Sequence, residues 1–251
     1  MLNSNNTGAA HIACPATISP VPASNPPAGG PQSSRRFGGQ RWKPVRCRTS
    51  PPARDTWYAE GGQVFDNLYL LTTKMNSAWA VNTSAGIILI DTLYGDAAQD
   101  EIVNGLKKVG LDPANIKYIV VSHAHGDHNG SVKVVQDTYN PRIIMSPKDW
   151  ELSAREANPP HRDIDATDGR KLTLGDTTIT IYITPVTPPE LFPVLVPVKD
   201  HGVPHLAMEW GGTALSGNTS RKMLRSYTSN AGRFLDIAEG GRPGDHPPVR
   251  R

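Results

Sequence analysis

Four potential metal ligands lie within the six-residue segment His123-Ala124-His125-Gly126-Asp127-His128. This segment directly follows the apolar run Tyr118-Ile119-Val120-Val121, which predicts a buried β-strand. A strand that ends here presents three imidazoles and one carboxylate at the edge of a sheet. Imidazole nitrogens and carboxylate oxygens are the ligands that suit zinc in a catalytic site. The segment therefore predicts a metal site, and the alternative interpretation is a polar loop with a chance cluster of histidines.

Further segments connect this pattern to a known family. The His-x-His-x-Asp-His motif resembles that of the metallo-β-lactamase superfamily, and the resemblance extends over residues 57–239. His128 directly after Asp127 fits the third metallo-β-lactamase subclass, since the first subclass has arginine there. The supporting segments, which stand in the family's order, are a strand ending in an aspartate, a hairpin, and two segments similar to the third subclass: Gly86–Thr92, Gly169–Thr184, Val196–Asp200 and Trp210–Thr213.

The resemblance implies a fold, a cofactor and a reaction. The implied fold is a mixed α/β (α+β) chain arranged as an αββα sandwich, here with a short C-terminus. The family binds two zinc ions, and the resemblance assigns His123 and His125 to one of them and Asp127 and His128 to the other. Zinc lowers the pKa of bound water to about 7, and the resulting hydroxide attacks a carbonyl group. The resemblance implies that Asp127 is the catalytic carboxylate, which binds one ion and orients this nucleophile.

Asp91, at the end of the predicted strand that begins at Gly86, has two interpretations. It can accept a hydrogen bond from an imidazole and so fix the tautomer of a metal ligand. It can also cap the turn that precedes Leu93, which is a common role for an aspartate at the end of a strand.

The third histidine that the family uses on its first zinc is missing. The family has it in a Thr-Pro-Gly-His-Thr-Pro-Gly segment, whereas here Thr184-Pro185 is followed by Val-Thr-Pro-Pro-Glu-Leu-Phe-Pro at 186–193. If a single G is inserted ahead of these codons, the shifted frame can read Gly-His-Thr-Pro-Gly-Thr-Leu-Ser without codon conflict. The residues from Val194 onward match the family again without a gap. We therefore expect a pair of compensating single-base insertions and deletions, in the gene or in its sequencing, and the alternative is ordinary divergence.

The second zinc also lacks a clear last ligand. The family places this ligand near the C-terminus, after a strand that follows the long helix. His246 matches by order alone, but no apolar strand precedes it, so we interpret it as a tail histidine. Glu190 is a weaker candidate for an oxygen ligand. The remaining histidines are interpreted as residues of loops, surface, core or the N-terminal tract: His11, His161, His201 and His205.

These features leave two main hypotheses. The first is a zinc-dependent hydrolase with two zinc ions per chain, acting on a lactam, lactone, ester or thioester; the motif does not select among these substrates. The second is a degenerate member of the family with an incomplete site and one zinc ion or fewer, which the missing ligands favour. A histidine-rich storage or structural zinc module is less consistent with the sequence, because the ligands lie on a single loop.

Composition limits the domain organisation and the partners. Residues 1–55 are rich in Pro, Gly, Ser and Arg and predict a disordered tract, residues 56–240 predict the folded domain, and residues 241–251 predict an unstructured tail. The formal charge of +3 and the absence of a basic helix argue against nucleic acid, so a small-molecule substrate is expected. Cys14 and Cys47 both lie in the N-terminal tract and imply no disulfide framework. No membrane span or signal sequence is recognisable, so we expect a cytoplasmic protein without a membrane partner.

Periodicity predicts the elements of the domain. The amphipathic pattern of residues 96–110 indicates a helix that ends at Gly110. Strands are predicted over 64–73, 78–83, 86–91, 116–122, 142–146, 177–184, 195–198 and 205–210, and further helices over 131–139 and 220–239. Strands and helices are mixed without strict alternation, as expected for two sheets between layers of helices.

Overall fold

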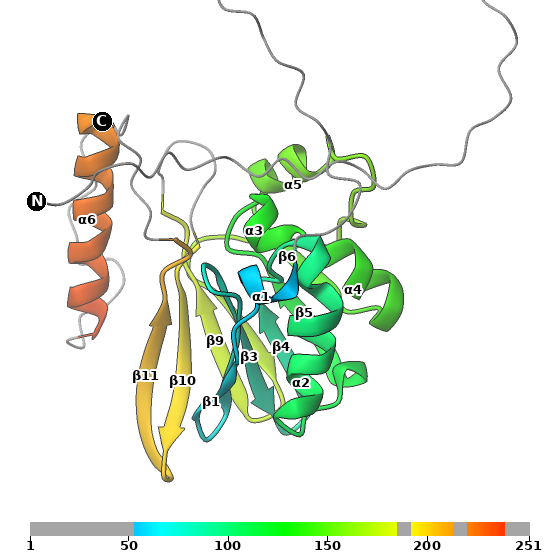
Figure 1. Cartoon of the computed structure of the whole chain (residues 1–251). Helices are drawn as coiled ribbons and strands as arrows, with labels where there is room; N and C mark the ends of the chain where they lie inside the picture. Colours follow the sequence, from blue (N-terminus) through cyan, green and yellow to red (C-terminus); the bar gives the residue numbers. More distant parts are fainter. Residues whose placement is uncertain (1–52, 185–191, 213–219, 239–251) are drawn as a thin grey trace, which may run out of the picture. The chain divides into compact units, whose positions relative to one another are not determined.

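The computed structural model describes residues 53–184, 192–212 and 220–238, which form two β-sheets packed face to face between helices (Figure 1). By its internal contacts the chain divides into two units, Met1–Pro51 and Pro52–Arg251, and the description below concerns the second. Val186–Leu191, Glu190 among them, and His11 and His246 therefore lie outside the described residues, as do nearly all of the expected disordered tract and the C-terminal tail.

The larger sheet has the strand order β1-β2-β3-β4-β5-β6-β7. Its first four strands are antiparallel neighbours: β1 (Gly62–Phe65), β2 (Leu68–Thr72), β3 (Ser77–Thr83) and β4 (Gly86–Ile90). The remaining strands run parallel to β4: β5 (Ile116–Val120), β6 (Arg142–Met145) and β7 (Ile164–Asp165). Because β4, β5 and β6 are parallel, their carboxyl ends meet at the same edge of the sheet.

The smaller sheet is antiparallel, with the order β11-β10-β9-β8. It consists of β8 (Arg170–Leu174), β9 (Thr177–Ile181), β10 (Val194–Asp200) and β11 (Val203–Glu209). β10 and β11 pair in unbroken register from Val194↔Glu209 to Asp200↔Val203. The predicted hairpin and the predicted strand pair are thus both present.

Helices connect the parallel strands and follow the smaller sheet. A helical segment after β4 comprises η1 (Gly95–Ala97), η2 (Ala98–Val103) and α2 (Asn104–Lys108), and η3 (Pro113–Asn115) leads into β5. The others are α1 (Arg54–Trp57), α3 (Gly126–Asn129), α4 (Val132–Tyr139), α5 (Pro147–Ser153) and α6 (Arg221–Ala238). Within the described part of the chain, no helix combines the length and apolarity needed to cross a lipid bilayer.

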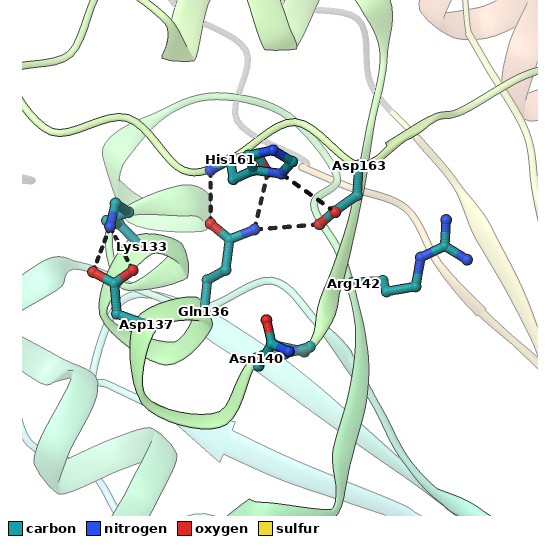
Figure 2. Close-up of a pocket in the computed structure, with 8 residues that line it drawn as sticks. Lys133, Gln136, Asp137, Asn140, Arg142, His161 and Asp163 are labelled. Carbon is teal, nitrogen blue, oxygen red and sulfur yellow. Dashed lines mark hydrogen bonds and ion pairs between the residues drawn. The ribbon is translucent and has the colours of Figure 1, made fainter.

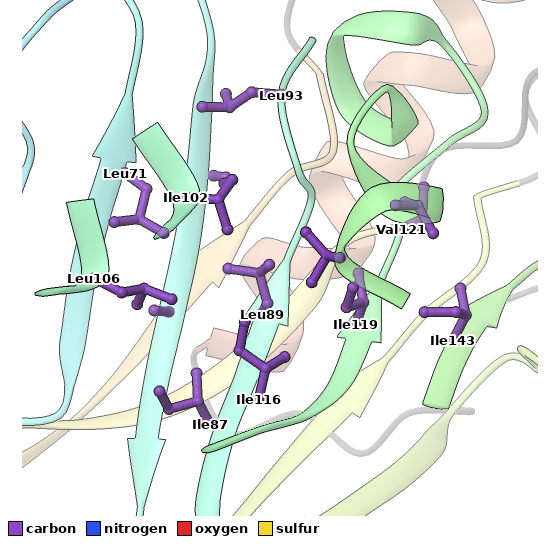
Figure 3. Close-up of a cluster of buried hydrophobic side chains, with 14 of the residues drawn as sticks. Leu71, Ile87, Leu89, Leu93, Ile102, Leu106, Ile116, Ile119, Val121 and Ile143 are labelled. Atoms are coloured by element: carbon purple, nitrogen blue, oxygen red, sulfur yellow. The ribbon is translucent and has the colours of Figure 1, made fainter. Parts of the chain in front are cut away.

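Both faces of the larger sheet are buried, which explains the continuous apolar runs of its central strands. On one face, Leu89 and Ile119 pack with Leu106 of α2 and with Val132 and Val135 of α4 (Figure 3). On the other face, alternate residues of the same strands pack against the smaller sheet: Ile88, Ile90, Val120 and Ile144 meet Ile179, Ile181, Val194 and Val196. Phe234 of α6 packs on Tyr182, which follows β9, and on Leu195 of β10, which points away from the core that Val194 and Val196 enter. The predicted αββα sandwich is therefore confirmed.

The structure differs from the sequence prediction in local detail. The helix predicted over 96–110 begins with a 3₁₀ turn, η1, and a π-helical segment, η2. The π-helical segment places Glu101 on the buried side beside Ile102. The predicted loop after β5 contains the helical turn α3 within the ligand motif itself. The helix α5 was not predicted, although Ser146 caps it and Pro147 opens it, which are recognisable signals of a helix start.

Two residues at the end of the N-terminal tract contact the domain. Arg54 Nε donates a hydrogen bond of 3.1 Å to Asp100 Oδ2, and Lys74 Nζ donates one of 2.6 Å to the backbone oxygen of Asp55. A truncation that preserves the domain should therefore end before Ala53.

Candidate metal centre

The ligand segment is held in place by the strands that flank it. Asp91 N–H bonds the Val120 carbonyl at 2.9 Å, and Val121 N–H bonds the Ile144 carbonyl at 3.0 Å, so β5 is supported on both sides up to its end. His123 follows Ser122 directly and is only 5% exposed. The chain then turns into α3, whose first turn closes where the amides of His128 and Asn129 donate to the His125 carbonyl. The ligand segment therefore starts from the rigid centre of the sheet.

The structure brings three of the four predicted ligands into one group, and the fourth, His125, contacts His123. His123, Asp127 and His128 each offer one ligand atom, and these atoms all lie within 4.8 Å of one another. His128 Nε2 lies 3.5 Å from Asp127 Oδ2, and His125 Nδ1 lies 3.1 Å from His123 Nε2. The side chains therefore converge as a metal site requires, while their assignment to one ion or to two stays a prediction.

The inner nitrogens of two imidazoles face hydrogen-bonding groups of the protein. His128 Nδ1 lies 2.7 Å from Asp91 Oδ2, and Ser122 Oγ lies 3.2 Å from the Nδ1 atoms of both His123 and His128. Such partners fix the tautomer and ring orientation of a metal-binding histidine. The Nε2 atoms of these two imidazoles instead face the other candidate ligands, His125 and Asp127, so a metal bound through Nε2 would take the place of these contacts.

Asp91 takes the first of its two proposed roles in these contacts. Its carboxylate accepts hydrogen bonds of 2.7 Å from Ser122 N–H and from Ser122 Oγ, in addition to its contact with His128. Asp91 is 2% exposed and adopts a left-handed backbone with φ of 62°, which aspartate tolerates better than most residues. The described hydrogen bonds of this carboxylate go to Ser122 and to the candidate ligand His128, and not to the turn before Leu93.

Two further supporting residues were not predicted. Asn76, in the connection between β2 and β3, donates from Nδ2 to Asp127 Oδ2 at 2.9 Å. Asp149 of α5 is fully buried, and its Oδ1 accepts the N–H of Ala124 at 3.0 Å, between the first two histidines. The capping signal at Ser146 could have identified Asp149 as a helix-start residue, but no sequence signal linked either residue to the ligands.

The surroundings set the charges of the ligands. Burial, and then the neighbouring charges of His128 and His125, lowers the pKa of His123 to about 3, so this imidazole is neutral and ready to bind a metal. Burial acts to raise the pKa of Asp127, but the hydrogen bond to His128 and its charge outweigh this and lower the pKa to about 2. Burial acts to lower the pKa of His128, but its bonds with Asp127 and Asp91 raise the pKa to about 10. A metal that binds His128 must therefore displace a proton.

This donor set fits zinc. It provides at least two imidazoles and one carboxylate, with the inner nitrogens already bonded, which is the arrangement found around zinc in proteins. Of the other histidines in the described residues, His161 and His201 have side chains that are 82% and 96% exposed, and His205 is exposed on β11. These three do not join the group.

A separate cavity of about 500 Å³ lies between the end of α4, the start of β6 and the loop before β7 (Figure 2). Its polar groups bond one another: Gln136 bridges His161 and Asp163, and Lys133 pairs with Asp137. None of the predicted metal ligands lines this cavity.

The family model of the metallo-beta-lactamase superfamily matches residues 71–220, and the chain belongs to this superfamily. An uncharacterised protein of Methanocaldococcus jannaschii, MJ0732, is 30% identical to the chain over 121 residues. That alignment covers 48% of this chain and 28% of the relative, so the chain spans little more than a quarter of the length of the curated relative it matches.

Solved structures of β-lactamases, two of them described as B3 enzymes, share the fold. A B3 enzyme described as the first with an active-site glutamic acid superposes with a TM-score of 0.62 at 21% identity, covering 74% of this chain and 78% of the other. BJP-1, a subclass B3 enzyme of Bradyrhizobium japonicum, gives a TM-score of 0.59 at 21% identity, covering 76% and 86%. A β-lactamase from Chitinophaga pinensis gives 0.61 at 20% identity, covering 75% and 84%. The family model thus confirms the predicted superfamily, and the solved structures confirm that the chain shares its fold with enzymes of the third subclass.

Proposed function

We propose that this chain is a zinc-dependent hydrolase that cleaves a small-molecule lactam, lactone, ester or thioester at its carbonyl group. The observation that carries the proposal is the convergence of His123, Asp127 and His128 within 4.8 Å at the end of β5, with Asp91 bonded behind them. The proposed partner is a small molecule and not nucleic acid or a membrane, and two zinc ions per chain are proposed from the family pattern.

The residues of the chain would divide the work as follows. Zinc, when bound, supplies Lewis acidity and makes water acidic enough to react at neutral pH. His123, His125 and His128 would hold the metal through nitrogen, and Asp127 would hold it through oxygen while orienting the attacking water. Asn76 fixes one oxygen of Asp127, and the low pKa of Asp127 keeps this carboxylate ionised at neutral pH.

The alternative is a degenerate family member that binds metal weakly and turns over poorly. It is favoured by one specific observation, the absence of histidine from residues 186–193. A catalytic zinc usually has three protein ligands and an open position, so two histidines hold it weakly. We expect the chain as written to hydrolyse carbonyl substrates poorly for this reason.

Zinc content and hydrolysis, measured on the same preparation, test the proposal. Replacing residues 186–193 by Gly-His-Thr-Pro-Gly-Thr-Leu-Ser should raise both values, and it puts leucine at the fully buried position of Phe192, which keeps that site apolar. Asp127→Asn should then lower hydrolysis of a chromogenic lactam, lactone or thioester strongly, while Asp137→Asn, an exposed change on α4, should not. If the restored chain binds about two zinc ions but shows no turnover on any of these substrates, the hydrolase proposal fails.

A further inference from the structure

Glu209, the last residue of β11, is a buried carboxylate that the proposed chemistry does not use. Glu209 and Ala207 are two residues apart on β11, so their side chains lie on the same face of the sheet. Ala207 packs against the core between the two sheets, and the Glu209 side chain therefore points into the same space. Its Oε1 accepts the N–H of Gly211 at 2.7 Å. Its Oε2 is buried and has no hydrogen-bonding partner among the described residues. Burying a carboxylate with one unpaired oxygen costs free energy of folding. Its presence at this position therefore calls for an explanation.

The Glu209–Gly211 bond holds a turn that only glycine can make. Gly211 has a φ of 82°, and a Cβ there would lie 3.2 Å from the Phe192 carbonyl oxygen and 3.3 Å from Ser122 Cβ. The turn is therefore wedged between the start of β10 and the end of β5. The N–H of Phe192 also donates to the Ser122 carbonyl at 3.0 Å, so the two sheets are joined at this point.

The same turn reaches the metal ligands. The Gly211 carbonyl oxygen lies 3.4 Å from Ser122 Oγ, and the same hydroxyl lies 3.2 Å from His123 Nδ1. A hydrogen-bonding group held at the inner nitrogen of a metal-binding histidine fixes both its tautomer and its orientation. The path from Glu209 to His123 is thus the hydrogen bond to the Gly211 amide, the Gly211 peptide, and the Ser122 hydroxyl, which faces both the Gly211 carbonyl and the His123 ring.

We infer that Glu209 is a positioning residue for His123, acting across the seam between the two sheets by fixing the Gly211 carbonyl. The inference rests on the proposed function in so far as His123 is taken as a metal ligand. Glu209 belongs to the smaller sheet. No residue of this sheet is in the group of candidate ligands that the described residues form.

The chemistry of the position indicates which substitute preserves this role. Burial, and then the nearby charge of Asp91, raises the pKa of Glu209 to about 8. The hydrogen bond from Gly211 N–H and the charge of His128 act in the opposite direction, to lower this pKa, but burial and Asp91 outweigh them. Glutamine has the shape of the neutral acid and retains the acceptor for Gly211 N–H. Methionine fills similar space but cannot accept this bond.

The experiment compares Glu209→Met and Glu209→Gln with a matched control, Glu101→Met, in the full chain. Glu101 is likewise buried with an unpartnered oxygen, but it lies on η2 and not at the seam. Zinc affinity is measured by competition with a chelator. Glu209→Met should weaken zinc binding about 10-fold or more, whereas Glu209→Gln and Glu101→Met should stay within about 3-fold of wild type. Unchanged affinity in Glu209→Met, or an equal loss in Glu209→Gln or Glu101→Met, overturns the inference.

A second measurement needs no zinc, and its first part uses the wild-type protein alone. In the metal-free wild-type protein, long-range ¹H–¹⁵N NMR should show His123 as the neutral tautomer with its proton on Nδ1, facing Ser122 and Gly211. A proton on Nε2 overturns the inference. If the protein binds no zinc but shows the Nδ1 tautomer, and Glu209→Met alters it, then the metal-site proposal fails while the positioning role stands.

Discussion

Glu101 should make the protein less stable at neutral pH than at acidic pH. This residue is 2% exposed on the π turn η2, and its Oε1 has no partner among the described residues. Burial raises its pKa from 4.5 to about 7, against the opposing charges of Arg54 and Lys108. Between these two values the folded state holds a proton that the unfolded state has released, so the free energy of unfolding falls as pH rises.

The magnitude follows from the shift in pKa. A shift of about 2.5 units corresponds to about 3 kcal/mol, lost progressively between pH 4.5 and 7 and constant above that. Glu101→Gln removes this titration and keeps a polar side chain of the same length. The variant should therefore gain about 3 kcal/mol relative to wild type on going from pH 4.5 to pH 8, whatever its stability at either pH.

Urea unfolding of the metal-free full chain across this pH range measures the effect. The difference in the free energy of unfolding between variant and wild type contains no contribution from the other carboxyl groups, Glu209 included, because they titrate alike in both proteins. A control, Asp100→Asn, alters a half-buried neighbour that pairs with Arg54 and should show a much smaller pH-dependent difference. If the stability difference between Glu101→Gln and wild type is the same at pH 4.5 and pH 8, the reasoning from burial is refuted.

Three further predictions concern the supports of the site and the domain boundary. Asn76→Ala releases Asp127 Oδ2 and should weaken zinc binding about 10-fold in a chelator competition; unchanged affinity would contradict its role. Asp149→Ala leaves the Ala124 amide and the Ser146 hydroxyl without their acceptor and should lower the free energy of unfolding in urea by about 2 kcal/mol or more, whereas a neutral effect would contradict the contact. Deleting residues 1–52 should leave the melting temperature nearly unchanged, and a drop of several degrees would show that the tract packs on the domain.

The sequence predicts the parts of the fold that depend on local pattern. β4 and β5 are continuous apolar runs because both faces of the larger sheet are buried, and the ligand motif follows β5 directly. The four candidate ligands could therefore be proposed without the structure, and three of them, His123, Asp127 and His128, converge in it. The π turn at Ala98–Val103 was not predicted, because hydrophobic periodicity over so few residues does not separate it from an α-helix.

The support behind the ligands could not be predicted in the same way. Asn76, Asp149 and Glu209 reach the ligand segment from other strands and helices, and each acts through a single hydrogen bond that depends on tertiary packing. Asp91 was identified as a candidate because it ends a strand beside β5. Only the structure distinguishes its two interpretations, since both place an acidic residue at the same point of the chain.

The central claim is that the segment at the end of β5 binds zinc. Equilibrium dialysis against buffered zinc, followed by elemental analysis, compares wild type with His123→Ala and with His161→Ala, whose side chain is 82% exposed in the wild type. The structure predicts that His123→Ala loses most of the bound zinc with an unchanged far-ultraviolet circular dichroism spectrum, and that His161→Ala binds as the wild type does. If the wild type binds no zinc, or if His123→Ala retains the wild-type amount, the metal-site account is wrong.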